Sequence, residues 1–157
     1  MGAGTWESHH AITSLMFRYA ECVDGADFDG IAALFARGKI TNEGVAGAIV
    51  GPDAVRKLYE RTNRVHEDGT TRTRHVNSNV IVDIDDDAAN ATARSSFVVF
   101  QQTPVLSLQP IVSGRYRDTF VRSGSDWRFE CRHIVVDHVG DVREHLTFDL
   151  SSFFDEP

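Results

Sequence analysis

The hydrophobic residues in the first part of the chain recur with the period of an α-helix. An apolar stripe runs along residues 7–23 at spacings of three and four, and its members are Ile12, Leu15, Met16, Tyr19 and Val23. Gly25 follows shortly afterwards, and glycine readily takes the left-handed conformation that ends a helix. A shorter helix is predicted over residues 28–35, where Asp27 can serve as the N-cap.

The next segment predicts a β-hairpin and a third helix. Two short runs with the composition of strands, residues 39–43 and 46–50, flank Gly44. Pro52 then opens a helix, because proline lacks an N–H that the first helical turn would leave unpaired. The apolar stripe of this helix consists of Val55, Leu58 and Tyr59.

From residue 71 onward the period of the pattern changes to two, which is typical of strands. Four long strands are predicted, at residues 73–84, 88–103, 108–122 and 126–138. Turn-forming residues separate neighbouring strands, so we expect an antiparallel meander. Helices followed by strands predict an α+β fold in which the helices pack on one face of a curved sheet.

The 157 residues are expected to form a single domain, residues 1–157, with a core at about residues 8–139 and a tail at residues 140–157. The tail is short and amphipathic. Its aromatic residues Phe148, Phe153 and Phe154 predict that it docks on the rest of the domain.

The strand at residues 73–84 divides by parity into two different faces. One face carries Val76, Val80, Val82 and Ile84. The other face carries His75, Asn77, Asn79 and Ile81. An imidazole and two amides on one face are compatible with a wet pocket, which would place the valines at a dimer interface.

The composition is that of a globular protein, with 41% hydrophobic and 25% charged residues. The net charge of −7 argues against nucleic acid and anionic membrane surfaces as partners. Cys22 and Cys131 suggest two buried thiols in a reducing compartment rather than a disulfide framework. Because no long apolar run is present, we expect a soluble, cytoplasmic protein.

Several segments together resemble the SnoaL-like branch of the nuclear transport factor 2-like superfamily. They are Phe17-Arg18-Tyr19 with Asp24, and residues 27–35, 51–55, 74–79, 114–118 and 127–129. The resemblance implies an α+β cone, in which a strongly bent antiparallel sheet wraps around three N-terminal helices. It also implies an apolar pocket at the mouth of the cone and a homodimer or homotrimer.

Within that branch the motifs are most similar to scytalone dehydratase, bile-acid 7α-dehydratase and hexachlorocyclohexane dehydrochlorinase. Those enzymes use a tyrosine of the first helix or one of its neighbours, an aspartate near the end of that helix and a histidine on the first long strand. Tyr19, Asp24 and His75 stand at the matching places. The dehydratases carry a second histidine or aspartate on the next strand, where this chain has Gln101. For the arginine of the dehydrochlorinase, Arg122 is the nearest match.

These three residue types suit a 1,2-elimination that needs neither a metal nor another cofactor. A histidine can remove a proton near neutral pH, a carboxylate can orient its ring, and a phenol can donate a hydrogen bond to a developing oxyanion. We therefore predict a lyase, with His75 as base, Asp24 as its orienting group and Tyr19 as donor. The expected partner is a small apolar hydroxy-carbonyl or ring substrate, bound by Phe35, Phe100, Gln101, Tyr116 and Arg122.

Other interpretations of the same residues remain open at this stage. Tyr19 and His75 also fit a core tyrosine and a hydrogen-bonded strand histidine. Glu43 and Asp118 stand where ketosteroid isomerases place their base and their protonated acid, which would indicate an isomerase. A non-catalytic binding or scaffold protein, similar to the small subunit of ring-hydroxylating dioxygenases, is a further alternative.

Overall fold

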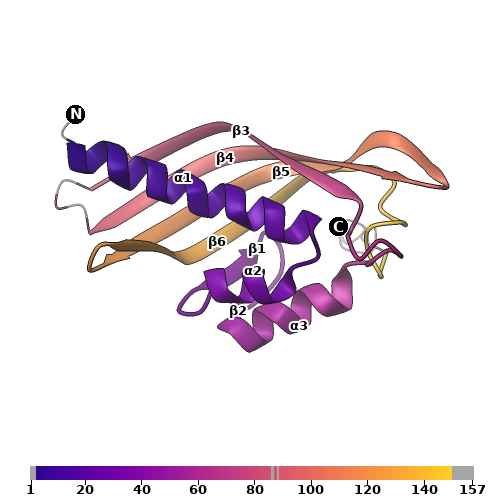
Figure 1. The fold of residues 1–157 in the computed structure, drawn as a ribbon, viewed down its shortest axis with the longest axis horizontal. Coiled ribbons are helices and arrows are strands. Elements are labelled where there is room, and N and C mark those ends of the chain that lie inside the picture. The colour runs from indigo at the N-terminus through magenta and orange to yellow at the C-terminus, as the bar shows by residue number, and fades with distance from the viewer. Residues whose placement is uncertain (1–2, 86, 88, 150–157) are drawn as a thin grey trace.

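The apolar stripe of the first helix packs against the inner face of a curved sheet (Figure 1). The structure is a computed structural model that describes residues 3–85, 87 and 89–149. Its helices are α1 (Ala3–Asp24), α2 (Phe28–Leu34) and α3 (Pro52–Thr62). Its strands are β1 (Lys39–Asn42), β2 (Ile49–Val50), β3 (Thr73–Ile84), β4 (Asn90–Thr103), β5 (Leu106–Ser123) and β6 (Asp126–Val139).

The strands form one sheet in the order β2-β1-β6-β5-β4-β3. β3 to β6 are the predicted antiparallel meander. β1 pairs with β2 as the predicted hairpin and also extends the sheet by pairing in parallel with β6, where Lys39 lies opposite Cys131. The described part of the chain thus consists of three helices and a strongly curved, unclosed, mixed sheet, which confirms the predicted α+β cone.

The sheet bends where the pairing of its long strands shifts register. Such shifts occur in β4 after Val99 and in β5 before Gly114. An extra residue on one strand bends that strand and increases its twist. A Cβ on Gly114 would come within 2.1 Å of the carbonyl oxygen of Val135, so the close approach at this bend requires glycine.

A further bulge in β3 corrects the predicted division of this strand into two faces. Asn79 has a φ of 52°, and regular pairing stops at Ser78 and resumes at Ile81. The parity of the strand changes there, so the three later apolar residues point to the same side as His75 and pack against the core: Val80, Val82 and Ile84. These three side chains are therefore not available for the expected dimer interface, whereas Val76 is exposed.

The core lies between the sheet and α1, which crosses it, with α2 and α3 at one side (Figure 1). The helix contributes the predicted stripe, of which Ile12, Met16, Tyr19 and Val23 are buried. None of the helices in the described residues has both the length and the apolar character needed to cross a lipid bilayer.

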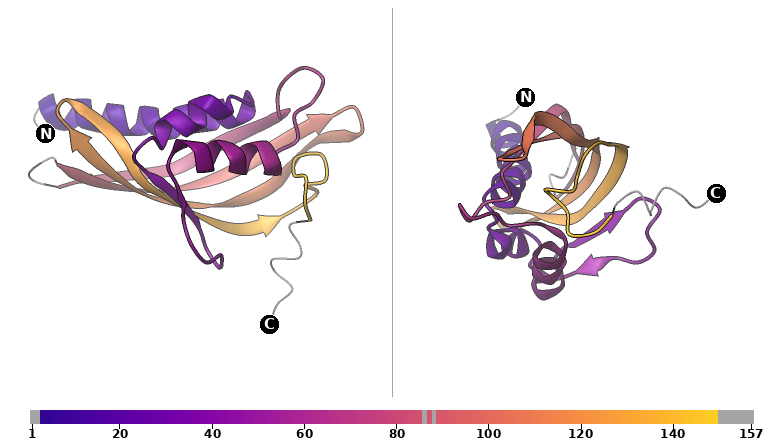
Figure 2. Two further views of the ribbon diagram at one scale, coloured as in Figure 1. Left: turned by 90° about the horizontal axis from the view of Figure 1, so that it is seen from below. Right: turned by 90° about the vertical axis from the view of Figure 1, so that its right-hand side faces the viewer.

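Residues 140–149 of the tail fold back across the end of the curved sheet (Figure 2). The backbone N–H of Arg64 donates to the His145 carbonyl at 2.8 Å, and that of Thr147 donates to the Thr62 carbonyl at 3.0 Å. Val142 and Leu146 pack against the core. Docking is therefore visible up to residue 149, while Phe153 and Phe154 lie outside the described residues.

Candidate functional site

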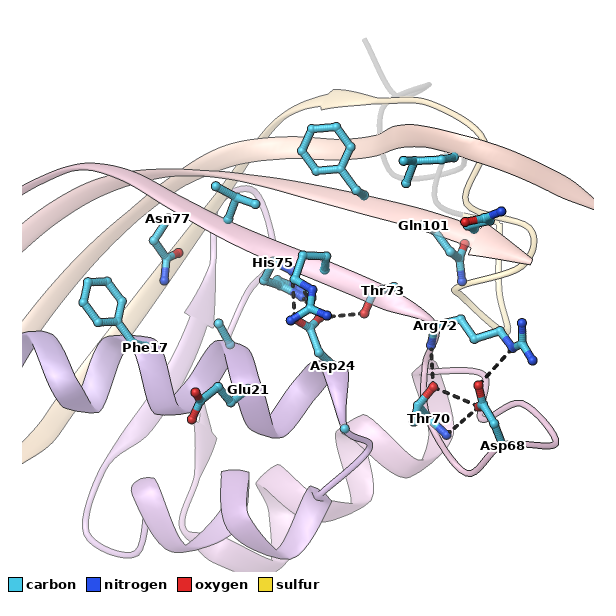
Figure 3. Close-up of a pocket in the computed structure, with 17 residues that line it drawn as sticks. Phe17, Glu21, Asp24, Asp68, Thr70, Arg72, Thr73, His75, Asn77 and Gln101 are labelled. Carbon is cyan, nitrogen blue, oxygen red and sulfur yellow. Dashed lines mark hydrogen bonds and ion pairs between the residues drawn. The ribbon is translucent and has the colours of Figure 1, made fainter. Parts of the chain in front are cut away.

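The last turn of α1 and the first residues of β3 meet at a pair of polar side chains, Asp24 and His75 (Figure 3). Thr71 joins the two elements, because its backbone N–H donates to the Asp24 carbonyl at 3.3 Å and its hydroxyl lies 3.0 Å from the Val23 carbonyl. The carboxylate therefore projects from a fixed helix end toward a fixed strand.

Asp24 and His75 form a hydrogen-bonded dyad. The Nδ1 atom of His75 lies 2.6 Å from Oδ1 of Asp24. The same carboxylate accepts a hydrogen bond from the backbone N–H of His75 at 2.9 Å and one from the Thr73 hydroxyl at 2.7 Å. Because an ionised carboxylate only accepts, the neutral form of the ring carries its proton on Nδ1 and has a free lone pair on Nε2.

The environment keeps Asp24 ionised. Burial acts to raise the pKa of this carboxyl, but the hydrogen bonds from His75 and Thr73 and the attraction of a protonated His75 ring outweigh it, so the pKa lies below its ordinary value. An ionised Asp24 fixes the tautomer of His75 and stabilises the imidazolium that forms when Nε2 takes a proton. Nε2 itself makes no hydrogen bond to any of the residues that the structure describes.

A groove of about 840 Å³ opens beside the dyad, between α1, β3 and the loop that precedes β3 (Figure 3). Its lining is largely polar, with Glu21, Asp68, Arg72 and Arg74 among its members, and Phe17 adds apolar surface on the α1 side. Phe100 also borders the groove, but it pairs with Arg74 and so faces the side of the sheet opposite His75. Asn77 adds a polar side chain two residues beyond His75 on β3. Beside the dyad the groove thus offers a base, an amide and the ring of Phe17 to a small molecule.

Tyr19 is buried in the core and does not line this groove. Its hydroxyl is hydrogen-bonded to that of Tyr59, and the guanidinium of Arg132 lies 4.2 Å from its ring centre. Burial raises the pKa of Tyr19 against the opposing effect of Arg132. The structure therefore brings Asp24 and His75 together, while a catalytic role of Tyr19 stays a prediction.

The five predicted substrate-binding residues are dispersed. Phe35 and Tyr116 are buried in the core, where they pack against Phe129 and Phe97. Phe100 and Gln101 line the groove, and the amide of Gln101 donates to the carbonyls of Thr71 and Glu144, each at 3.0 Å.

Arg122 does not lie near the dyad. His75 pairs with Val99, which pairs with Val112 of β5. Arg122 pairs with Trp127 close to the opposite end of β5, roughly 30 Å from Val112 at about 3.3 Å per residue.

The residues of the alternative isomerase site are separated by the sheet. Asp118 is fully buried and forms two hydrogen bonds with Arg132, at 2.9 and 2.7 Å. Glu43 is 65% exposed and accepts a hydrogen bond from Nε2 of His133 at 2.8 Å. His133 follows Arg132 on β6 and so faces the opposite side of the sheet. Among the described residues, no three histidine, cysteine or acidic side chains are grouped to hold a metal ion.

One residue near the dyad was missed by the sequence analysis. The docked tail places His145 beside His75, with ring centres 6.4 Å apart and ring planes at 69°. His145 is only 6% exposed. Val142, His145 and Leu146 stand at positions i, i+3 and i+4, the spacing of residues on one helical face. Because the other two are apolar, this spacing indicates that His145 faces inward.

We expect docking of the tail to weaken as the pH falls below about 6.5. Burial, together with the neighbouring His75 and His66 and against the effect of Asp24, lowers the pKa of His145 to about 3. An undocked His145 regains an ordinary pKa near 6.5 and binds a proton that the docked form refuses. The equilibrium constant for docking therefore falls about tenfold per pH unit between these two values.

Hydrogen exchange of the Arg64 amide, which bonds to the His145 carbonyl, measures this effect after correction for the intrinsic exchange rate. The His145→Gln variant is the matched control and should show no such dependence. Protection that is independent of pH in the unmodified protein would contradict the prediction.

Comparison with known proteins supports the assignment of the fold. The sequence profile of a family described as a SnoaL-like domain matches residues 4–133. A candidate scytalone dehydratase from Novosphingobium aromaticivorans is 25% identical, with a TM-score of 0.71, 90% of this chain covered and 91% of that chain. A variant of Rv3472, a protein of unknown function from Mycobacterium tuberculosis, is also 25% identical, with a TM-score of 0.70 and coverages of 86% and 75%.

LinA shares the fold at 18% identity, with a TM-score of 0.70 and coverages of 89% of this chain and 92% of that chain. A comparison with curated protein sequences gave no significant match.

Proposed function

Because the chain belongs to the SnoaL-like domain family of the nuclear transport factor 2-like fold, we propose that it is a cofactor-independent lyase. The proposed reaction is the dehydration of a small, largely apolar hydroxy-carbonyl compound. The observation that carries the proposal is the Asp24–His75 dyad. Nδ1 of His75 faces the carboxylate and Nε2 does not, and the dyad lines a groove of about 840 Å³.

Each part of the dyad has a chemical task in such an elimination. Nε2 of His75 removes the proton on the carbon next to the carbonyl group, and Asp24 stabilises the imidazolium through Nδ1. As the carbon–carbon double bond forms, the bond to the β-hydroxyl group breaks. The departing hydroxide takes the proton from His75 and leaves as water, which restores the base.

The groove has room for a small organic molecule beside the dyad. Phe17 offers apolar contact on the α1 side, and Asn77 offers an amide to one polar group. Polar and charged side chains such as Glu21, Arg72 and Arg74 form much of the remaining lining, so the substrate class follows from the chemistry of the dyad and not from the lining. The similarity to the candidate scytalone dehydratase agrees with this chemistry.

The isomerase alternative is less well supported. Asp118 is held in a buried ion pair with Arg132, so it is not free to serve as a neutral proton donor. Glu43 lies on the other side of the sheet with His133. The proposal assigns no step to these two carboxylates, nor to Tyr19.

The test is product formation from a panel of β-hydroxy ketones, followed by the ultraviolet absorbance of the conjugated enone. The control lacks both groups of the dyad, Asp24→Asn with His75→Ala. We expect at least one compound to be dehydrated faster by the unmodified protein than by this double variant. Equal rates across the panel would reject the lyase and leave a binding protein as the better description.

A further inference from the structure

Residues 142–147 of the tail form a strap over the dyad end of the sheet. The strap is held by backbone hydrogen bonds to the segment after α3. Nε2 of His66, in the same segment, donates to the Glu144 carbonyl at 2.9 Å, and from β4 the Gln101 amide donates to the same carbonyl. The residue after Glu144 is His145, whose position is thus fixed by the bonds of its neighbours.

One ring nitrogen of His145 is turned into the protein. Nδ1 of His145 is buried and has no hydrogen-bond partner among the described residues, and the same is true of Oε1 of Gln101. Such atoms are uncommon in folded proteins, because a buried group without a hydrogen bond destabilises the fold. A phenylalanine would fill the same space without this penalty, so the imidazole indicates a hydrogen bond that a ligand completes.

The charge state of His145 suits a hydrogen bond to an oxygen. Burial and the neighbouring His75 and His66 keep the ring neutral near pH 7. A neutral imidazole donates from one nitrogen and does not compete with His75 for a proton. An imidazolium can therefore form at His75 without a second positive charge 6.4 Å away.

We propose that His145 is a second catalytic residue, which donates a hydrogen bond from Nδ1 to the carbonyl oxygen of the substrate beside His75. The inference rests on the proposed elimination. When Nε2 of His75 removes the α-proton, the enolate oxygen carries the negative charge, and Nδ1–H of His145 stabilises it while itself keeping its proton. The contact from His75 Nε2 to the α-carbon and the contact from His145 Nδ1 to the oxygen would each span roughly 3 Å. One carbonyl group and its α-carbon can therefore bridge the two neighbouring rings.

The strap must move for a substrate to reach this nitrogen. His145 does not line the groove in the closed arrangement, so the oxygen meets Nδ1 only after the strap lifts and docks again over the ligand. The strap would thereby couple closure of the site to completion of its hydrogen bonds.

Equilibrium binding tests the oxygen contact without any turnover. The probes are α-tetralone, a small apolar ketone, and tetralin, which has the same ring skeleton without the oxygen. The variants are His145→Phe, which keeps a ring, and His145→Gln, which keeps a hydrogen-bonding group. Calorimetric titration gives the affinities, and thermal unfolding checks that each variant is folded.

We expect the unmodified protein to prefer α-tetralone, and His145→Phe to lower that affinity by about five- to tenfold while the affinity for tetralin is unchanged. His145→Gln should retain most of the preference. Equal losses for both probes, or no preference for α-tetralone in the unmodified protein, including no binding of either probe, would overturn the assignment.

The two proposals can fail separately. If the preference for α-tetralone depends on His145 but no β-hydroxy ketone is dehydrated, the oxygen contact is supported and the proposed elimination is rejected. If His145→Phe dehydrates a substrate as fast as the unmodified protein and α-tetralone is not preferred, the elimination is supported and the role of His145 is rejected.

Discussion

Replacing His75 with alanine or Asp24 with asparagine is expected to lower kcat/KM for dehydration by about 10²–10⁴-fold, the usual contribution of a positioned general base. His75→Ala removes the group that takes the proton. Asp24→Asn keeps the shape of the side chain but loses the charge that accepts from Nδ1 at 2.6 Å. Without it, the tautomer with a free Nε2 is no longer favoured. Steady-state rates with a substrate from the β-hydroxy ketone panel measure both losses.

The two losses should not add, because the residues act as one unit. The double variant is expected to be about as slow as the slower single variant. The chain also offers a matched control, since His133 and Glu43 form a second histidine–carboxylate pair at 2.8 Å on the other side of the sheet. His133→Ala should leave the rate unchanged. Wild-type turnover in either dyad variant, or an equal loss in His133→Ala, would refute the assigned mechanism.

The order of the elements could be predicted from the sequence because each follows from local periodicity. The helical stripe ending at Val23 and the alternating strands after residue 71 appear in the structure with shifts of a few residues at their ends. The parallel pairing of β1 with β6 could not be predicted in the same way. It joins segments about ninety residues apart, and nothing in a local pattern specifies such a pairing.

The inner face of β3 shows how one residue changes a prediction. Alternation assigned the valines after Asn79 to the face opposite His75, on the assumption of an uninterrupted strand. Asn79 takes a positive φ and the strand bulges there. The bulge turns Val80, Val82 and Ile84 toward the core. Asparagine is among the few residues that adopt this conformation readily, so the bulge was compatible with the sequence but not required by it.

The candidate site was predicted in part. The pairing of Asp24 with His75 follows from a helix end and a strand start that lie close in space, and the motifs resembled those of known enzymes. His145 could not be found in the same way, because its position depends on the docking of a tail about seventy residues later. The placement of Tyr19 beside Arg132 likewise depends on packing in the core rather than on helical spacing.

Replacing Asp118 with alanine is expected to lower the free energy of unfolding by about 3–5 kcal/mol, the usual cost of leaving a buried charge without its partner. Arg132 and Asp118 are both 0% exposed and are joined by two hydrogen bonds. The guanidinium also lies against two rings, 4.2 Å from the centre of Tyr19 and 3.9 Å from that of Tyr116. Burial acts to lower the pKa of Arg132, but Asp118 outweighs it and raises that pKa. A guanidinium keeps its proton in proteins even without such a partner, so Asp118→Ala leaves a buried, unpaired charge.

Urea unfolding measures this loss against a pair of the same geometry at the surface. Arg115 and Asp137 also form two hydrogen bonds, at 2.8 and 2.7 Å, but both side chains are accessible to water. Asp137→Ala should therefore leave the urea midpoint almost unchanged, because water replaces the lost partner. Replacing both buried partners, Asp118→Val with Arg132→Met, should recover much of the stability lost in Asp118→Ala, since no unpaired charge then remains. If Asp118→Ala and Asp137→Ala shifted the urea midpoint equally, burial of the charge would not be the cause of the lost stability. The buried Arg132–Asp118 pair would then stabilise the fold no more than a surface pair does.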